Sequence, residues 1–193
     1  MYSYKISIII PCYNVSKYID RCMGCLKAQT FTDFEIICIN DGSTDNTLDT
    51  LNKYKRDGVR IISTTNQGVS QARNEGIMAA CGEYIYFFDP DDYLVPDALS
   101  ILFKKAKETN CDCVQFGFKV IQENGQEING KNGNKEVGIY DRKKIFEIIF
   151  PRYIGYSVND IKKYGTKDFY ENYEMCSVWR FLYKSSVIKE HNI

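Results

Sequence analysis

The chain has 193 residues, of which 44% are hydrophobic and 26% charged, so we expect one globular domain with a sizeable core. Its 25 basic and 25 acidic residues give a net charge of zero, which disfavours non-specific binding to nucleic acid or to an anionic membrane. The first apolar run, residues 6–11, is too short for a membrane span or a signal sequence, so we expect a cytosolic protein.

Strands and helices alternate in the first 109 residues. β-Branched and aromatic runs predict buried strands, and apolar residues spaced by three and four predict helices, the first of them capped by Ser16. Each strand and helix together take about 20 to 25 residues, which indicates a parallel sheet with helices on its faces. The predicted strands are residues 4–10, 34–40, 59–63 and 83–88, and the predicted helices are residues 16–29, 47–56, 70–81 and 96–109.

Each of these strands ends in a polar loop. In parallel sheets, ligands bind outside the carboxyl ends of the strands, where such loops meet at one edge. We therefore expect a binding site built from residues 11–13, 41–42, 66–68 and 89–92. Arg73 lies near the apolar face of the helix over residues 70–81, so its guanidinium needs an anion, which is either a protein carboxylate or a ligand phosphate.

The fourth strand ends in a cluster of acids, Asp89, Asp91 and Asp92. Two carboxylates about 5 Å apart repel by roughly 3 kcal/mol at an effective dielectric constant of 20, so a positive partner is expected. Oxygen ligands without nearby His or Cys suit Mg²⁺ or Mn²⁺, which also bind substrate phosphates. The alternative interpretation is a solvated acidic turn that caps the next helix.

The pattern is less regular beyond residue 109. We predict a strand over 112–122, a turn or hairpin over 123–138, a helix over 142–150, a Tyr-rich stretch to 176, a strand over 177–183 and a final helix over 184–190. Residues 1–110 would then bind the ligand, and residues 111–193 would form a smaller region of the same domain. The only histidine, His191, is expected at the surface.

The eight cysteines scatter over the predicted strands and helices, which favours reduced thiols over a disulfide framework. A zinc site made of Cys22, Cys25, Cys111 and Cys113 is disfavoured, because the two pairs lie on different predicted elements.

Four motifs together resemble the family 2 glycosyltransferases of the GT-A fold, which have a Rossmann-like, mostly parallel sheet. The motifs cover residues 5 to about 100 in the order and spacing of the family. They are Ser7-Ile8-Ile9-Ile10-Pro11-Cys12-Tyr13-Asn14, Asn40-Asp41-Gly42-Ser43-Thr44-Asp45, Asn66-Gln67-Gly68-Val69-Ser70-Gln71-Ala72-Arg73-Asn74 and Asp89-Pro90-Asp91-Asp92.

The resemblance implies transfer of a sugar, with inversion, from a nucleotide-diphospho-sugar, commonly a UDP-sugar, assisted by Mn²⁺ or Mg²⁺. It also implies that Tyr13 and Asp41 hold the nucleobase, that Arg73 lies near the nucleotide, and that Asp91 binds the metal with Asp89. Asp92 would orient the sugar or a metal-bound water. The implied nucleotide-sugar site thus comprises Pro11, Cys12, Tyr13, Asn14, Asp41, Arg73, Asp89, Asp91 and Asp92.

The general base of the family usually lies in a Glu-Asp or similar pair beyond a segment that resembles residues 179–184 and the helix after it. The chain ends at Ile193, before such a pair, so we expect a truncated enzyme that binds donor and metal but transfers sugar poorly or not at all. Glu171 and Glu174 are the candidates for a substitute base within the chain. The acceptor, a glycan or a lipid-linked glycan, would contact the residues after 109, close to the cytosolic face of a membrane.

Other functions fit the residues less well. A module that binds a nucleotide-sugar without catalysis remains the main alternative. A nucleotidyltransferase would need a Gly-rich, basic first loop, which residues 11–14 do not provide. The absence of G-x-G-x-x-G after the first strand disfavours a dinucleotide dehydrogenase, and the same inspection excludes a P-loop NTPase.

Overall fold

The computed structural model describes residues 2–122, 124–129, 138–141, 143 and 178–191. The chain divides into two compact units. The first joins residues 1–115 to residues 179–193, and the second comprises residues 116–178.

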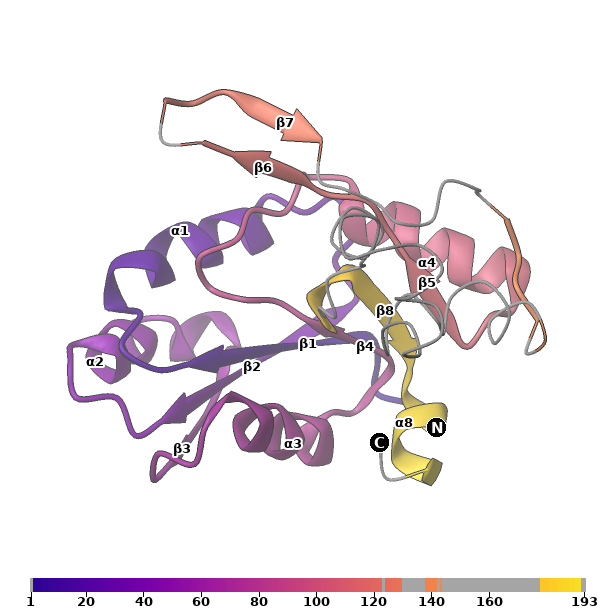
Figure 1. The fold of residues 1–193 in the computed structure, drawn as a ribbon. Helices are drawn as coiled ribbons and strands as arrows, with labels where there is room; N and C mark the ends of the chain where they lie inside the picture. Colours follow the sequence, from indigo (N-terminus) through magenta and orange to yellow (C-terminus); the bar gives the residue numbers. More distant parts are fainter. Residues whose placement is uncertain (1, 123, 130–137, 142, 144–177, 192–193) are drawn as a thin grey trace, which may run out of the picture. The chain divides into compact units, whose positions relative to one another are not determined.

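A six-stranded sheet forms the centre of the first unit (Figure 1). Its strands are β1 (Tyr4–Cys12), β2 (Phe34–Asp41), β3 (Arg60–Thr64), β4 (Gly82–Phe87), β5 (Cys113–Gln115) and β8 (Phe181–Lys184). They lie in the order β3-β2-β1-β4-β8-β5. The strands β1 to β4 are parallel, as predicted, whereas β8 runs antiparallel to both β4 and β5.

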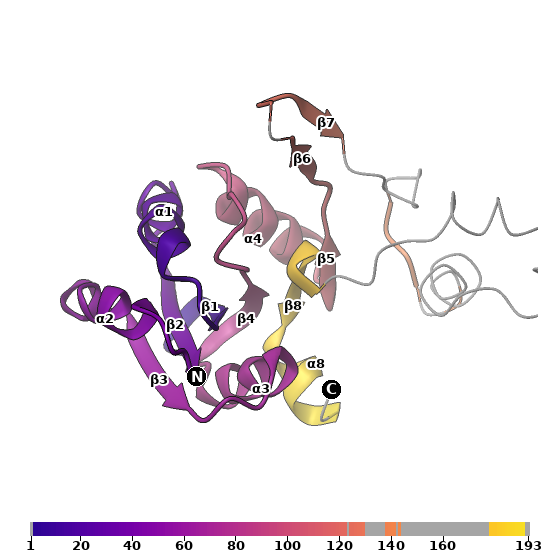
Figure 2. The same cartoon turned by 60° about the vertical axis from the view of Figure 1, so that its left-hand side comes forward.

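Helices cover both faces of this sheet. They are α1 (Ser16–Lys27), α2 (Thr47–Asn52), α3 (Val69–Ala79), α4 (Ala98–Thr109) and α8 (Ser185–His191). Figures 1 and 2 show α3 and α8 on one face of the sheet and α1 and α4 on the other. Short 3-10 segments, Lys55–Asp57 and Val178–Arg180, follow α2 and precede β8. This arrangement is the predicted α/β architecture of a mostly parallel sheet flanked by helices.

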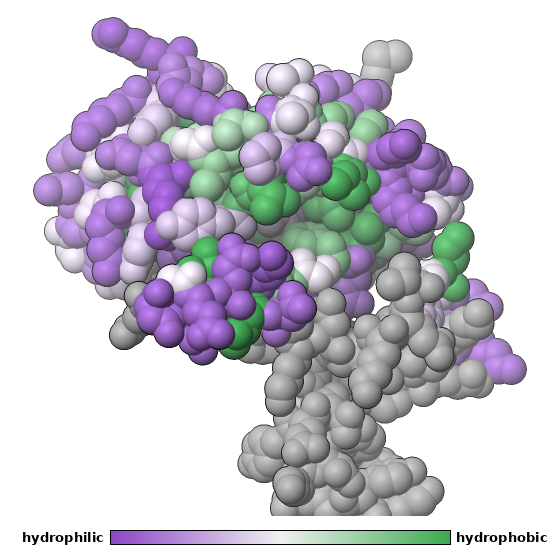
Figure 3. Space-filling view, turned by 90° about the horizontal axis from the view of Figure 1, so that it is seen from above, coloured by the Kyte–Doolittle hydropathy of each residue, from purple (hydrophilic) through white to green (hydrophobic). Residues whose placement is uncertain are grey.

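The hydrophobic core lies along β1. The side chains of Ile6, Ile8, Ile9 and Ile10 are all fully buried, because a central parallel strand is covered on both faces. Gly76 of α3 packs against this strand, and a Cβ atom at residue 76 would lie 2.3 Å from Ile9 Cγ2. The absence of a side chain at Gly76 therefore allows α3 to lie close to the sheet. In the view of Figure 3, hydrophobic groups gather in the middle and hydrophilic groups lie around them.

A buried polar network joins the amino ends of β2 and β4. Glu35 accepts hydrogen bonds from Ser7 Oγ and from the Cys81 main-chain N–H, both at 2.6 Å. Ser7 Oγ in turn accepts one from the Gly82 N–H at 2.8 Å, and Arg60 pairs with Glu35 at 3.3 Å. The network therefore fixes the edge of the sheet opposite to the loops that follow the strands.

The start of α1 corrects one prediction. Ser16 does not cap this helix: it is the first helical residue, and Val15 precedes it without a side-chain cap. The N–H groups of Val15 and Ser16 instead donate to Thr47 Oγ1 at 2.9 Å and to Asp45 Oδ2 at 3.2 Å. The cap comes from the segment after β2, which is distant in the sequence, so nothing near Ser16 could indicate it.

The predicted strand over 112–122 is wrong as a single element. Its first part is β5, and its last part is β6 (Lys119–Ile121), which pairs antiparallel with β7 (Glu127–Asn129) in the second unit. The chain passes from one unit to the other between them, which divides the strand. Only the second strand of this hairpin, β7, falls within the predicted turn or hairpin region over 123–138.

The remaining elements begin and end within a few residues of their predicted bounds, except that residues 178–180 are a 3-10 turn rather than strand. The predicted helix over 142–150, the Tyr-rich stretch, Glu171 and Glu174 lie outside the described residues, apart from residue 143. None of the helices in the described part of the chain is both long and apolar enough to cross a membrane.

Candidate active site

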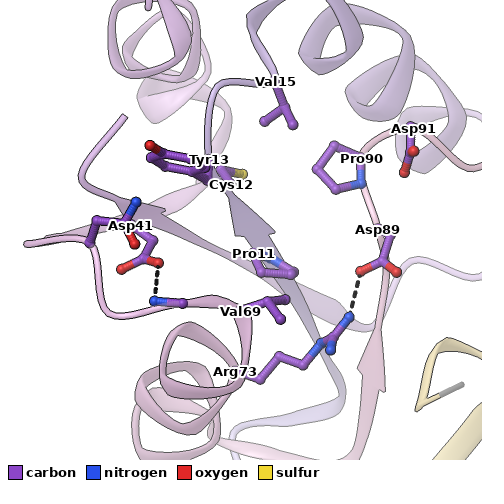
Figure 4. A pocket seen from close by; sticks show the side chains of 12 residues that line it. Pro11, Cys12, Tyr13, Val15, Asp41, Val69, Arg73, Asp89, Pro90 and Asp91 are labelled. Atoms are coloured by element: carbon purple, nitrogen blue, oxygen red, sulfur yellow. Dashed lines mark hydrogen bonds and ion pairs between the residues drawn. The ribbon is translucent and has the colours of Figure 1, made fainter. Parts of the chain in front are cut away.

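A cleft of about 470 Å³ lies at the carboxyl ends of the parallel strands (Figure 4). Its volume is within the range of about 300 to 1,000 Å³ that is usual for ligand pockets. Among the predicted binding residues, those that line it are Pro11, Cys12, Tyr13, Asp41, Arg73, Asp89 and Asp91. Asn14 and Asp92 are not among the lining residues. The cleft also includes Asn66, Gly68 and Pro90, which belong to the predicted loops, and Val15 and Val69, which lie outside them.

Tyr13 follows β1 and presents its ring to the cleft, as Figure 4 shows. The residue is 48% exposed. A large aromatic ring that is half exposed at the end of a buried strand has a face free for a ligand, which is what stacking on a nucleobase needs.

Asn14 does not line the cleft, and its side chain instead connects two loops. It has a positive φ of 54°, and its Oδ1 accepts hydrogen bonds from the Thr44 N–H at 2.8 Å and from the Asp45 N–H at 3.3 Å. Its own N–H donates to Ser43 Oγ at 3.2 Å. The side chain therefore holds the loop after β1 against the loop after β2, which positions Tyr13.

Asp41 connects the next pair of loops. It is 3% exposed, and its carboxylate accepts hydrogen bonds from the Gln67 N–H at 2.9 Å, the Gly68 N–H at 2.8 Å and Thr64 Oγ1 at 3.2 Å. A carboxylate has about four lone-pair sites, so one is left for a ligand in the cleft.

Gly42, directly after Asp41, allows this contact between the two loops. It has a φ of +66°, and a Cβ atom there would lie 2.6 Å from the Asn66 main-chain nitrogen. A larger residue would therefore push the loops after β2 and β3 apart, so the sequence motif needs glycine at this position.

Arg73 of α3 contacts the turn after β4, residues 89–92, which we call the acidic turn. Its Nη2 donates to Asp89 Oδ1 at 2.9 Å, and the side chains of both residues are largely shielded from water, with 20% and 26% exposed. The Nε of Arg73 is buried and has no hydrogen-bond partner within the part of the chain that the structure describes. The guanidinium of Arg73, which lines the cleft, thus pairs with a protein carboxylate, and its Nε is shielded from solvent.

The acidic turn concentrates negative charge. Asp91 is exposed, and the Asp92 N–H donates to the Asp89 carbonyl at 3.0 Å, which closes the turn. Burial, together with the neighbouring Asp89 and Asp91, raises the pKa of Asp92 to about 6, although Arg21 acts in the opposite direction. The turn therefore favours binding of a further positive charge.

The residues of the turn fit a divalent cation. Carboxylate oxygens are the ligands that Mg²⁺ and Mn²⁺ prefer. Within the described residues, no group of three or more His, Cys, Asp and Glu side chains is arranged to hold a metal ion. An ion at Asp89 and Asp91 would thus take its remaining ligands from water and from a bound phosphate, as Mg²⁺ commonly does.

Arg21 of α1 is a residue that the sequence did not indicate. Its Nη2 donates to the Asp91 carbonyl oxygen, and its guanidinium carbon lies 4.3 Å from the centre of the Tyr93 ring. The two contacts join residues that are far apart in the sequence, and no pattern near Arg21 predicts them.

The sequence of the chain decides its family. The sequence model described as Glycosyl transferase family 2 matches residues 7–189. The chain belongs to glycosyl transferase family 2. The resemblance drawn from the four motifs is thereby confirmed.

Named relatives of this family 2 chain act on several glycans. It is 41% identical over 131 residues to "Chondroitin synthase" of Pasteurella multocida (strain Pm70), a match that covers 66% of this chain and 14% of the relative. It is 39% identical over 151 residues to "Poly(ribitol-phosphate) beta-glucosyltransferase" of Bacillus spizizenii, which covers 75% of this chain and 24% of the relative. The chain therefore spans a quarter or less of the length of these relatives.

Solved structures of S. aureus TarS share the fold of this family 2 chain. The match to TarS 1-349 has a TM-score of 0.74 at 24% identity and covers 98% of this chain and 49% of that one. The complex of TarS 1-349 with UDP-GlcNAc gives a TM-score of 0.69 at 26% identity and covers 98% and 48%. The predicted GT-A fold is confirmed by this likeness.

Proposed function

We propose that the chain transfers a sugar, with inversion, from a UDP-sugar to a hydroxyl of a glycan or lipid-linked acceptor. The observation that carries the proposal is the meeting of Tyr13, Asp41, Arg73, Asp89 and Asp91 in one cleft. The bound UDP-GlcNAc of the TarS complex and the glycan products in the names of the relatives support the choice of donor and acceptor class.

The cleft provides separate contacts for each part of the donor. In the proposal, the ring of Tyr13 stacks on the base, and the free lone pair of Asp41 accepts a hydrogen bond from its edge. A terminal N–H of the Arg73 guanidinium that does not contact Asp89 donates to a phosphate oxygen, because a guanidinium matches the geometry of an anionic oxygen pair. The base and the diphosphate thus occupy opposite sides of the cleft.

In the reaction, the bond between the anomeric carbon and the diphosphate oxygen breaks while the acceptor oxygen bonds to that carbon from the opposite side. The acceptor proton passes to a carboxylate base, whose identity stays a prediction from the family resemblance. A divalent cation held by Asp91 and Asp89 would neutralise the charge that develops on the leaving diphosphate. Arg73 adds positive charge at the same place.

The test is titration calorimetry of the chain with UDP, GDP and ADP, each with Mn²⁺ and with a chelator. We expect UDP to bind most tightly of the three, and to bind much more tightly with Mn²⁺ than with the chelator. If a folded chain binds none of the three nucleotides, the proposed function is overturned.

A module that binds the donor without transferring its sugar is the alternative. Its support is that Asp41 and Asp89 are already engaged with Gly68 and Arg73, so neither is a free base in the cleft. Release of free sugar from a UDP-sugar distinguishes the two, since a pure binding module releases none. Placement at the cytosolic face of a membrane stays a prediction from the family resemblance.

A further inference from the structure

Arg21 of α1 contacts the acidic turn from outside the cleft. Arg21 Nη2 donates to the Asp91 carbonyl oxygen, and Nη1 donates to the Tyr93 hydroxyl at 3.2 Å. The guanidinium carbon lies 4.3 Å from the centre of the Tyr93 ring and 5.2 Å from that of Tyr18. Two aromatic rings and two acceptors thus fix one side chain.

The contact of Arg21 differs in kind from that of Arg73. Arg73 uses the carboxylate of Asp89, and so occupies an oxygen that a ligand could take. Arg21 uses the main chain of Asp91 and leaves the carboxylate of that residue exposed. A main-chain contact fixes the backbone from which the Asp91 carboxylate projects, and the positive charge offsets part of the repulsion within the turn.

We propose that Arg21 is a positioning residue that holds the Asp89–Asp92 turn in the form that binds the donor diphosphate with its cation. The inference rests on the proposed function, because it assigns to that site a support outside the cleft. Arg21 touches neither donor nor acceptor in this role. Its effect passes through the Asp91 main chain and the Tyr93 ring.

The chain offers a matched control on the same helix. Lys17 Nζ lies 4.6 Å from the centre of the Tyr18 ring, so Lys17 also places a cation over an aromatic ring of α1. The contacts that the structure gives for Lys17 do not include the acidic turn. Arg21→Met and Lys17→Met therefore remove the same charge from the same helix and differ in the contact that is tested.

The binding experiment compares UDP affinity with Mn²⁺ and with a chelator. Hydrogen bonds to charged groups and cation–π contacts are strong enough for Arg21→Met to weaken Mn²⁺-dependent binding by about tenfold. Binding with the chelator should stay at the parent value, which a general loss of structure would not allow. Arg21→Lys should lose less, since it keeps the charge but not the planar fork, and Lys17→Met should match the parent.

A second readout needs neither nucleotide nor metal. The Asp92 N–H is bonded within the turn, so its hydrogen exchange, followed in a peptide that spans residues 88–94, reports on the order of the turn. We expect faster exchange in Arg21→Met and the parent rate in Lys17→Met. Tyr93→Leu tests the same support from the other side, and because Tyr93 is 59% exposed, this variant should fold even if Arg21→Met does not.

The outcomes separate the two proposals. A parent chain that is folded and binds no nucleotide overturns the proposed function. A parent that binds UDP with Mn²⁺, together with an Arg21→Met or Tyr93→Leu variant that binds equally well, overturns the role of Arg21 alone. Faster exchange without a loss of Mn²⁺-dependent affinity overturns it too, since the order of the turn would then not matter for the ligand.

Discussion

At the scale of single residues, the carboxylate of Asp91 is the one acid of the turn that is exposed at the cleft. We expect Asp91→Asn to lower UDP affinity in the presence of Mn²⁺ to the value found with a chelator, because a neutral amide oxygen attracts a divalent cation less strongly than a carboxylate does. Calorimetry measures this. Asp97→Asn is the control, since Asp97 is an exposed acid just before α4 and makes no side-chain cap bond. An Asp91→Asn variant that binds like the parent removes Asp91 from the site.

Tyr13 gives a prediction of the opposite type, because its effect should not depend on metal. Stacking of a base on an aromatic ring contributes about 1 to 3 kcal/mol in nucleic-acid complexes, so Tyr13→Ala should weaken UDP binding by that amount with Mn²⁺ or with chelator. Tyr4→Ala is matched to it, since Tyr4 lies at the other end of β1 and is 41% exposed. Equal affinities for Tyr13→Ala and the parent would show that the ring does not contact the base.

At the scale of elements, the position of α3 depends on a residue without a side chain. Gly76→Ala would place a Cβ atom 2.3 Å from Ile9 Cγ2. Overpacking of this kind costs about 1 to 3 kcal/mol, so we expect a lower free energy of unfolding, measured with urea. Gly24→Ala in α1 meets no atom within 4 Å and should instead stabilise the chain, because alanine favours helix by about 1 kcal/mol. Equal stabilities of the two variants would contradict the proposed packing.

Most of the strands and helices could be predicted from the sequence alone. Runs such as Ile6 to Ile10 are decisive, because a buried parallel strand has to be apolar on both faces, and the order of strands and helices follows from them. The cap of α1 was missed because its acceptors are distant in the sequence: Asp45 lies in the loop after β2, and Thr47 is the first residue of α2.

In the candidate site, too, the sequence predicts some features and not others. The motifs bring Tyr13 and Asp91 to the cleft, since the carboxyl ends of parallel strands must meet. They do not show that Asp89 pairs with Arg73, for which two partners were open, or that Arg21 contacts the turn. Those contacts depend on how helices lie on the sheet, and short-range periodicity does not specify that.

At the scale of the whole molecule, the ionisation of Asp45 makes the free energy of unfolding depend on pH. Partial desolvation acts to raise its pKa, but the hydrogen bonds that it accepts from Thr47 and Ser16 outweigh this effect and lower the pKa to about 2. Since this is below the ordinary value of about 3.9, Asp45 contributes stability at neutral pH that is lost as the pH falls from about 4 to about 2.

The difference in unfolding free energy between the parent and Asp45→Asn should therefore shrink over that interval. Urea unfolding at several pH values measures it. The effect should be small, because Asp45 is exposed and water screens its contacts. A difference that is the same at pH 7 and pH 2 would contradict the prediction.

The links between the loops of the cleft share a property with a wider consequence. Asn14 bonds to the N–H groups of Thr44 and Asp45, Asp41 to those of Gln67 and Gly68, and Arg21 to the carbonyl of Asp91. Each of these links ends on a main-chain atom: a carbonyl oxygen, which every amino acid has, or an N–H, which every amino acid except proline has. Side chains on the receiving loops can thus be replaced during evolution while the framework of the cleft persists, so a chain of this design can acquire a new donor or acceptor preference without first acquiring a new shape.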